Sequence, residues 1–166
     1  MRFKLLGLMA ALLIVAGCET PAEETTTTET TTTEATPAPA APTMSAQEDL
    51  VINVGDRVFF DFDKSDLRPD AIDTLNRQSD WMKTNGSVTV AIEGHCDERG
   101  TREYNLALGD RRGASAKQYL ESMGVSGGRM ETVSYGKERP AVLGSNEAAW
   151  AQNRRAVMVV KSGELS

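Results

Sequence analysis

The chain has 166 residues, which is enough for one ordinary domain with appendages but not for two full domains. Its formal net charge is -6, and its basic residues form no concentrated patch. Because nucleic-acid binding needs clustered Lys and Arg to neutralise phosphates, the composition excludes nucleic acid as a partner.

Residues 1–17 have the pattern of a cleaved signal peptide. Basic residues precede an apolar run over residues 5–16, which is too short to cross a bilayer as a mature helix. The run ends in the letters VAGC at residues 15–18, which resemble the lipobox of bacterial lipoproteins. That resemblance implies acyl chains on Cys18 and, because Glu19 rather than Asp follows, anchoring in the outer membrane with the domain facing the periplasm.

Residues 18–49 are predicted to be a lipid-anchored, disordered tether. They are rich in Thr, Glu, Ala and Pro, and such a segment has too little apolar surface to offset the entropy of ordering. Some thirty residues would reach about 100 Å when extended and about 30 Å as a flexible coil. A glycosylated stalk is the alternative for Thr-rich sequence, and the lipobox argues against it.

The predicted folded domain covers residues 50–163 and begins with a strand at 57–62. Pro69 fits the first turn of a helix that should run to about Thr84, where Asn85 and Gly86 end it. Apolar residues recur at helical spacing on its inner face, at Ile72, Leu75 and Met82.

Alternation of Val and Ile with polar residues predicts a second strand from Val88 to Glu93. Continued past Gly94, the alternation places Cys96 on the buried side and His95 and Asp97 on the other. A free, buried Cys96 is expected, with little labelling by a thiol reagent.

A long helix is predicted from about Glu103 to Met123. Its inner stripe contains small residues that would let it lie close to the sheet, and consists of Leu106, Gly109, Gly113, Ala116 and Leu120. Arg112 lies off that stripe, on the flank of Leu108, facing the loop that carries Asp97.

The remaining elements are a strand at 130–135, a short helix at 147–152 and a last strand at 155–161. Strands separated by helices predict an α/β sandwich, a mixed sheet of about four strands with helices packed on one face. The sequence contains no internal repeat.

Four separated segments resemble one family. They read FDFDKSDLRP at 60–69, EGHCDERGTREYNLALGDRR at 93–112, SYGKERPAVLG at 134–144 and NRRAVMVV at 153–160. The chain resembles the OmpA C-terminal-like domain family and, within it, the peptidoglycan-associated lipoproteins. The resemblance implies non-covalent binding of meso-diaminopimelate in the peptidoglycan stem peptide, tethering of outer membrane to cell wall, and a role in envelope integrity and cell division. It also implies partnership with the Tol system, notably TolB.

The ligand residues follow from chemistry together with the resemblance. Diaminopimelate presents an ammonium and a carboxylate on one carbon, so Asp97 would accept from the ammonium and Arg112 would grip the carboxylate. The resemblance adds five residues that should line the site: Phe62, Asp63, Gly100, Thr101 and Leu108. Without the resemblance, a solvated Asp–Arg pair would be the simpler interpretation. Arg154 and Arg155 are interpreted as structural, ordering loops or pairing with acids such as Glu93.

Two other functional classes were weighed against this one. An enzyme is disfavoured because His95, Cys96 and Asp97 are adjacent in an extended segment and point in alternate directions, so no metal or other cofactor is expected. A stator or porin relative is disfavoured because no predicted membrane span remains after the leader. A wall-binding lipoprotein without Tol partners stays open.

Overall fold

The computed structural model describes residues 44–166, so the predicted signal peptide, Cys18 and most of the predicted tether lie outside the described residues. The described part is built on one four-stranded sheet in the order β1-β4-β2-β3. The strands are β1 (Arg57–Phe59), β2 (Thr89–His95), β3 (Met130–Gly136) and β4 (Arg155–Ser162). β2 and β3 are parallel, whereas β4 runs antiparallel to both β1 and β2, so the sheet is mixed as predicted.

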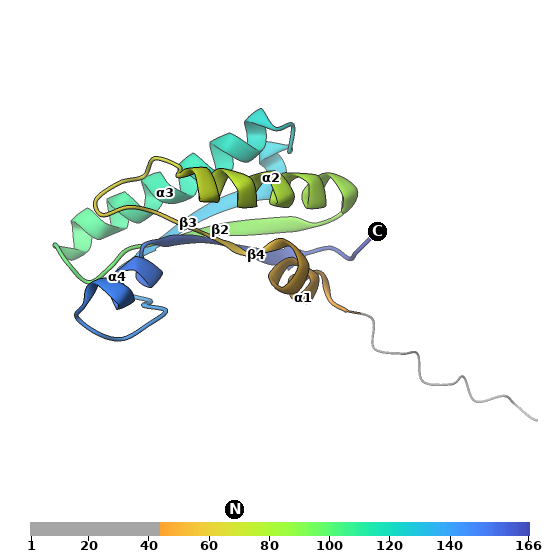
Figure 1. Ribbon diagram of the computed structural model, residues 1–166. Helices are drawn as coiled ribbons and strands as arrows, with labels where there is room; N and C mark the ends of the chain where they lie inside the picture. Colours follow the sequence, from red (N-terminus) through yellow and green to blue (C-terminus); the bar gives the residue numbers. More distant parts are fainter. Residues whose placement is uncertain (1–43) are drawn as a thin grey trace, which may run out of the picture. The chain divides into compact units, whose positions relative to one another are not determined.

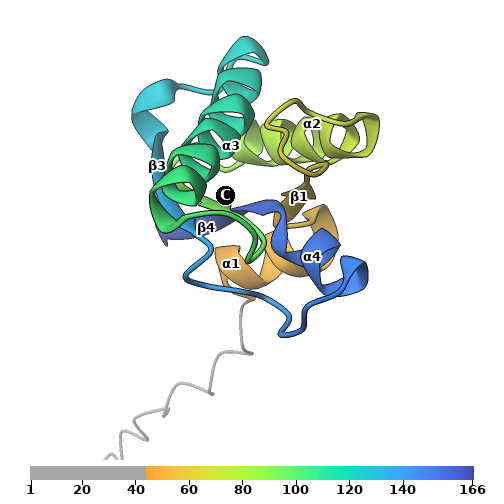
Figure 2. The same ribbon diagram turned by 90° about the vertical axis from the view of Figure 1, so that its left-hand side faces the viewer.

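Helices lie on both sides of this sheet. The two long helices, α2 (Pro69–Thr84) and α3 (Arg102–Ser122), cover one face (Figures 1 and 2). The short helices α1 (Ala46–Asp49) and α4 (Glu147–Asn153) lie on the opposite side. The predicted α/β sandwich is therefore confirmed for the long helices, and the short helices add to it.

Two single turns complete the described elements: a π-helical turn (Leu50–Val54) after α1 and a 3-10 turn (Gly127–Arg129) before β3. The helix predicted from Pro69 to Thr84 is confirmed, and it ends at Asn85 as expected. No helix within residues 44–166 is both long and apolar enough to cross a membrane.

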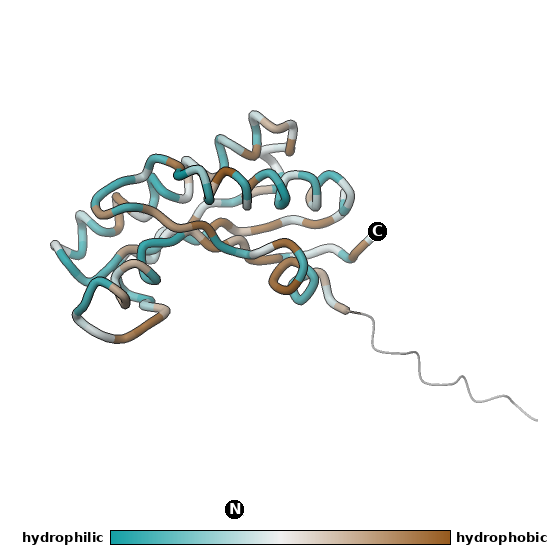
Figure 3. Tube along the Cα trace, in the orientation of Figure 1, coloured by the Kyte–Doolittle hydropathy of each residue, from teal (hydrophilic) through white to brown (hydrophobic). Residues whose placement is uncertain are grey.

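The core lies between the sheet and the two long helices. Hydrophobic colour follows the strands in Figure 3. The largest fully buried apolar side chains include Leu50, Phe60, Leu75, Met82, Ile92 and Leu120. Ile72, which was predicted to face the core, is only half-buried.

The folded unit begins earlier than predicted, because α1 falls within the segment 18–49 assigned to the tether. Ser45 and Glu48 form a reciprocal capping box at its start. Asp49 then accepts a hydrogen bond from the Trp81 indole at 2.6 Å, and Leu50 is fully buried. The capping pattern and these long-range contacts order the last residues of the segment assigned to the tether.

Three further expectations need correction. β1 ends at Phe59 rather than at residue 62, although the amide of Phe60 still donates to Arg154 O. His95 and Asp97 are buried alongside Cys96, because the strand register shifts at Gly94 and His95. The buried stripe of α3 includes Arg112 and excludes half-buried Leu106.

Helix α3 crosses β2 and β3 at very close range, as its small residues predicted. A Cβ placed on Gly94 would overlap the carbonyl oxygen of Gly109, and one placed on Gly109 would overlap the Ser134 hydroxyl. Ser134 Oγ donates to Leu106 O at 2.6 Å in the same contact. This packing brings the start of α3 down onto the end of β2.

We expect Gly94→Ala to destabilise the fold by about 2–3 kcal/mol, because overpacking a backbone contact forces helix and sheet apart. Gly86→Ala is the matched control, since no atom lies within 4 Å of a Cβ there. Chemical denaturation of both variants measures the difference. Equal unfolding midpoints would contradict the close packing.

Cys96 follows β2 and is 2 % exposed, which confirms the predicted burial. Its thiol donates to Asn105 O at 3.3 Å. Burial raises the pKa of Cys96 to about 11, although nearby Arg112 lowers it. The thiolate, which is the reactive form, is therefore scarce at neutral pH.

We expect a maleimide or disulfide reagent to label Cys96 slowly in the native chain at pH 7–8 and fully after denaturation. Both burial and the raised pKa act in this direction. The predicted acylation of Cys18 would keep that residue from competing for reagent. Rapid, complete labelling of the native chain, followed by mass spectrometry of the peptide carrying Cys96, would contradict the buried position.

Candidate functional site

A cavity of about 150 Å³ opens where β2 leads into α3. Its walls come from the loop after β1, the loop between β2 and α3, and the first turns of α3. The lining combines acidic, basic and apolar side chains and consists of Phe62, Asp63, Cys96, Asp97, Arg99, Gly100, Tyr104, Asn105, Leu108 and Arg112.

Arg112 is the floor of this cavity and has no exposed surface. Its guanidinium donates to three main-chain carbonyls: Nε to Lys64 O at 2.8 Å, Nη1 to His95 O at 2.8 Å and Nη2 to Asp61 O at 3.1 Å. A guanidinium carries five N–H groups. The three bonds therefore leave two N–H groups without a main-chain acceptor, and Arg112 holds a buried positive charge at the cavity floor.

Asp97 supplies the negative charge and is 5 % exposed. Oδ1 accepts from the main-chain N–H and from Nε of Arg99, both at 3.1 Å. Oδ2 accepts from Nη2 of Arg99 at 2.6 Å and from Nη1 of Arg154 at 3.5 Å. Burial by itself raises the pKa of Asp97, but the hydrogen bonds from Arg99 outweigh it, so the pKa lies below its usual value. The carboxylate is thus ionised at neutral pH.

The loop between β2 and α3 is held in place from several directions. Lys137 Nζ donates to Gly100 O at 2.7 Å and to Glu98 O at 3.2 Å. Asn105 Nδ2 donates to Arg99 O and Thr101 O from within α3. Gly100 has φ +87°, a left-handed conformation that glycine adopts without strain. These contacts fix the carboxylate of the loop relative to the floor.

The outer rim joins the loop after β1 to α3. The Tyr104 hydroxyl donates to Asp63 Oδ1, and Asp63 itself has φ 56°. Phe62, in the same loop, is 57 % exposed, whereas Leu108 is buried and forms the apolar wall. The rim therefore offers an exposed aromatic ring beside a second carboxylate.

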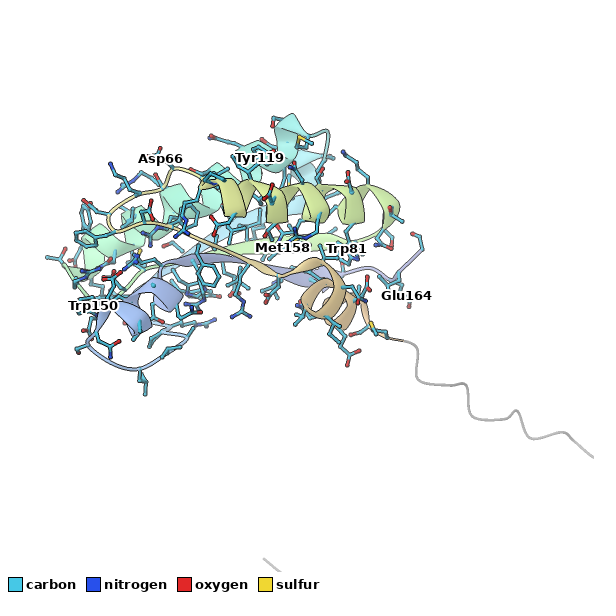
Figure 4. The ribbon with its side chains drawn as sticks, viewed as in Figure 1. Asp66, Trp81, Tyr119, Trp150, Met158 and Glu164 are labelled. Atoms are coloured by element: carbon cyan, nitrogen blue, oxygen red, sulfur yellow. The ribbon has the colours of Figure 1, made fainter. Side chains whose placement is uncertain are left out.

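Two aromatic side chains, Phe62 and Trp150, lie against the Arg99 guanidinium and are called the aromatic clamp; of the two, Phe62 lines the cavity. The Arg99 guanidinium lies 4.0 Å from the centre of the Phe62 ring and 4.1 Å from that of Trp150. Trp150 projects from α4, and its indole N–H donates to Glu98 at 3.0 Å (Figure 4). Helix α4 thereby contacts a site that is otherwise built by the loop after β1, the loop between β2 and α3, and α3 itself.

Six of the seven residues predicted to contact the ligand line this cavity, and Thr101 does not. Thr101 instead caps α3, where its hydroxyl accepts from the Tyr104 amide at 3.2 Å. Besides Cys96, which was expected only to be buried, sequence reasoning missed three lining residues: Arg99, Tyr104 and Asn105. All three lie in the segment 93–112, and this was the only sequence signal that could have identified them. No periodicity in that segment indicates which of its polar residues point into the cavity.

Of the neighbouring residues considered as catalytic or metal-binding candidates, Cys96 and Asp97 line the cavity and His95 does not. His95 is buried beside Tyr135 with a ring-centre distance of 5.5 Å, and burial lowers its pKa to about 4, with Arg155 and Arg139 lowering it further. Within residues 44–166, no group of three or more His, Cys, Asp or Glu side chains is placed to hold a metal ion.

Arg154 orders loops, as its position before the last strand suggested. Its Nε donates to Phe60 O at 3.0 Å, and its Nη2 pairs with Glu147 at 2.6 Å. The acid it reaches in the cavity is Asp97 rather than Glu93. Arg155 donates to the carbonyls of Asn153 and Arg139 at 3.4 and 3.3 Å.

Comparison with known proteins places this arrangement in a family. The model of the OmpA family matches residues 59–154. The peptidoglycan-associated lipoprotein of Rhizobium meliloti is 53% identical over 118 residues, which are 71% of this chain and 67% of that protein. That of Mesorhizobium japonicum is 48% identical over 149 residues, 90% and 86% of the two chains.

A solved structure agrees with these relatives. The crystal structure of the peptidoglycan-associated lipoprotein from Burkholderia pseudomallei superposes with a TM-score of 0.62 at 42% identity, covering 64% of this chain and 90% of that one. Sequence identity and fold therefore indicate the same family. The chain therefore belongs to the OmpA family and, within it, to the peptidoglycan-associated lipoproteins.

Proposed function

We propose that this chain binds the meso-diaminopimelate of peptidoglycan stem peptides non-covalently and so tethers the outer membrane to the cell wall. One observation carries the proposal: Asp97 and Arg112 have opposite charges and line the same small cavity. Membership of the peptidoglycan-associated lipoproteins supports the same ligand class.

The chemistry of the cavity suits the zwitterionic end of the ligand. Asp97 accepts from the ammonium, and the two remaining N–H groups of Arg112 donate to the carboxylate. Both residues are buried, so water competes little for either contact. A volume of about 150 Å³ admits an amino-acid tip but not a whole peptide, so the rest of the stem would lie over Phe62 and Tyr104.

Affinity at a single site should be modest. A few charge-assisted contacts of about 1.5–3 kcal/mol each, less the cost of ordering the ligand, correspond to micromolar or weaker binding. Acyl chains on Cys18 would confine the domain near a repeating polymer. Many weak contacts at high effective concentration can then hold membrane and wall together.

We also propose that this chain is a partner of the Tol system. Family resemblance supports binding to TolB and a role in envelope integrity and cell division. The other candidate is a wall-binding lipoprotein of the same fold that acts without Tol partners. Both share the cavity, so ligand binding does not separate them.

The ligand is tested by calorimetry of the full chain in detergent with two tripeptides, one ending in meso-diaminopimelate and one in lysine. We expect about 10–100-fold weaker binding of the lysine peptide, which lacks the extra carboxylate. Asp97→Asn should weaken binding of both peptides, while Asp110→Asn, which removes an exposed carboxylate of α3, should leave both unchanged.

Arg112→Lys should remove most of the preference, because an ammonium cannot keep the carbonyl contacts and also grip a carboxylate. Lysine is used instead of alanine since alanine would leave three buried carbonyls without a donor. Equal affinity of the unaltered chain for both peptides would overturn the assigned roles.

The partner is tested by mixing purified TolB with the full chain and measuring complex formation by analytical ultracentrifugation. We expect a complex, with an unrelated lipoprotein in the same detergent as control. No complex, together with retained binding of the diaminopimelate peptide, would favour the wall-binding lipoprotein without Tol partners.

A further inference from the structure

The anionic half of the cavity already holds a cation from its own loop. Arg99 makes three of the four hydrogen bonds to Asp97, through its main-chain N–H, Nε and Nη2. The fourth comes from Arg154 at 3.5 Å. Each carboxylate oxygen thus accepts two bonds, and an ionised carboxylate offers about four acceptor positions in all. A ligand ammonium must therefore displace a donor to reach Asp97.

Arg99 is the donor that can leave. Its side chain is 30% exposed, whereas that of Arg154 is 7% exposed. Arg154 is also held by Phe60 O and by Glu147, so moving it would disturb the loops around β4. Moving the Arg99 side chain breaks only its own contacts with Asp97, Phe62 and Trp150.

The aromatic clamp stabilises this closed arrangement. Phe62 and Trp150 face the guanidinium at 4.0 and 4.1 Å from different elements, and such contacts favour the cation. The hydrogen bond to Asp97 also raises the pKa of Arg99. Arg99 therefore stands where the ammonium of a ligand would stand.

We propose that Arg99 is a built-in competitor for the ligand ammonium and so sets the affinity of the site. Binding exchanges one cation on Asp97 for another, and the net gain comes from the ligand contacts with Arg112 and the apolar wall. The empty site keeps its buried carboxylate neutralised. This inference rests on the proposed function, because it concerns the same cavity.

The test is calorimetry of Arg99→Gln in the full chain with the diaminopimelate and lysine tripeptides. Displacing Arg99 from Asp97 has the same cost for both peptides. Removing the Arg99 side chain should therefore strengthen the binding of both peptides by the same factor, about fivefold for one partly exposed ion pair. The ratio between the two peptides should not change. Arg102→Gln is the matched control, because Arg102 begins α3 and pairs with Glu138 rather than Asp97.

A second readout follows the side chain itself. The chain has two tryptophans, so Trp81→Phe leaves Trp150 as the only indole. Adding the diaminopimelate peptide should change Trp150 emission as Arg99 leaves the ring. In the Trp81→Phe, Arg99→Gln double variant the same addition should change emission little, although the peptide binds.

The possible results distinguish the competitor role of Arg99 from the proposed wall-binding function. Weaker binding by Arg99→Gln would make Arg99 a ligand contact and overturn its role as a competitor. Unchanged affinity with unchanged Trp150 emission would overturn it also, while leaving the wall-binding function intact. Failure of both the unaltered chain and Arg99→Gln to bind either peptide would remove both. Binding by Arg99→Gln alone would support the competitor directly.

Discussion

A guanidinium with no exposed surface joins three segments that are far apart in the sequence. Arg112 leaves α3 and donates to carbonyls at Asp61, Lys64 and His95, which belong to the loop after β1 and to the end of β2. Burial lowers the pKa of Arg112, which reflects the cost of holding the charge there. Each of the three carbonyls accepts a charge-assisted hydrogen bond from Arg112, which offsets part of that cost. The floor of the cavity and the arrangement of its walls thus depend on the same side chain.

The contact between Gly94 and Gly109 makes this arrangement possible. Any side chain at either position would lift α3 off the sheet, and Arg112, one turn further along α3, would then lose reach to His95 O. Close packing of backbone against backbone therefore sets the depth of the cavity. Lys137 and Asn105, from different parts of the chain, both donate to carbonyls of the adjoining loop. The backbone that carries Asp97 is therefore held in place, and such preorganisation reduces the ordering cost of binding a ligand.

Charge balance explains why the cavity can remain polar while buried. Asp97 is paired with Arg99 and Arg154, and Arg112 is surrounded by carbonyl dipoles. An isolated charge at either position would be costly. The same balance means that a cationic ligand group would have to replace an existing contact of Asp97. In the proposed function, affinity at this carboxylate depends on the difference between two sets of charged contacts, which suits reversible binding to a polymer.

Much of this fold could be predicted from local patterns. Proline and asparagine at its ends marked α2, alternation marked β2, and small residues marked the side of α3 that meets the sheet. Local signals suffice for these elements because periodicity and capping act over a few residues. Asp97 and Arg112 lie in one strand–loop–helix segment, but choosing them as the two charges of the site also needed the family resemblance.

Other features were decided only by tertiary structure. The ordering of α1 depends on Trp81 and on the burial of Leu50. Two of the three carbonyls that accept from buried Arg112 lie 48 and 51 residues away in the sequence. The Arg99 guanidinium that pairs with Asp97 also contacts Phe62 and Trp150, which lie far from it and from each other in the sequence. A sequence states which groups can donate and accept, but which of them meet is determined when distant segments pack together.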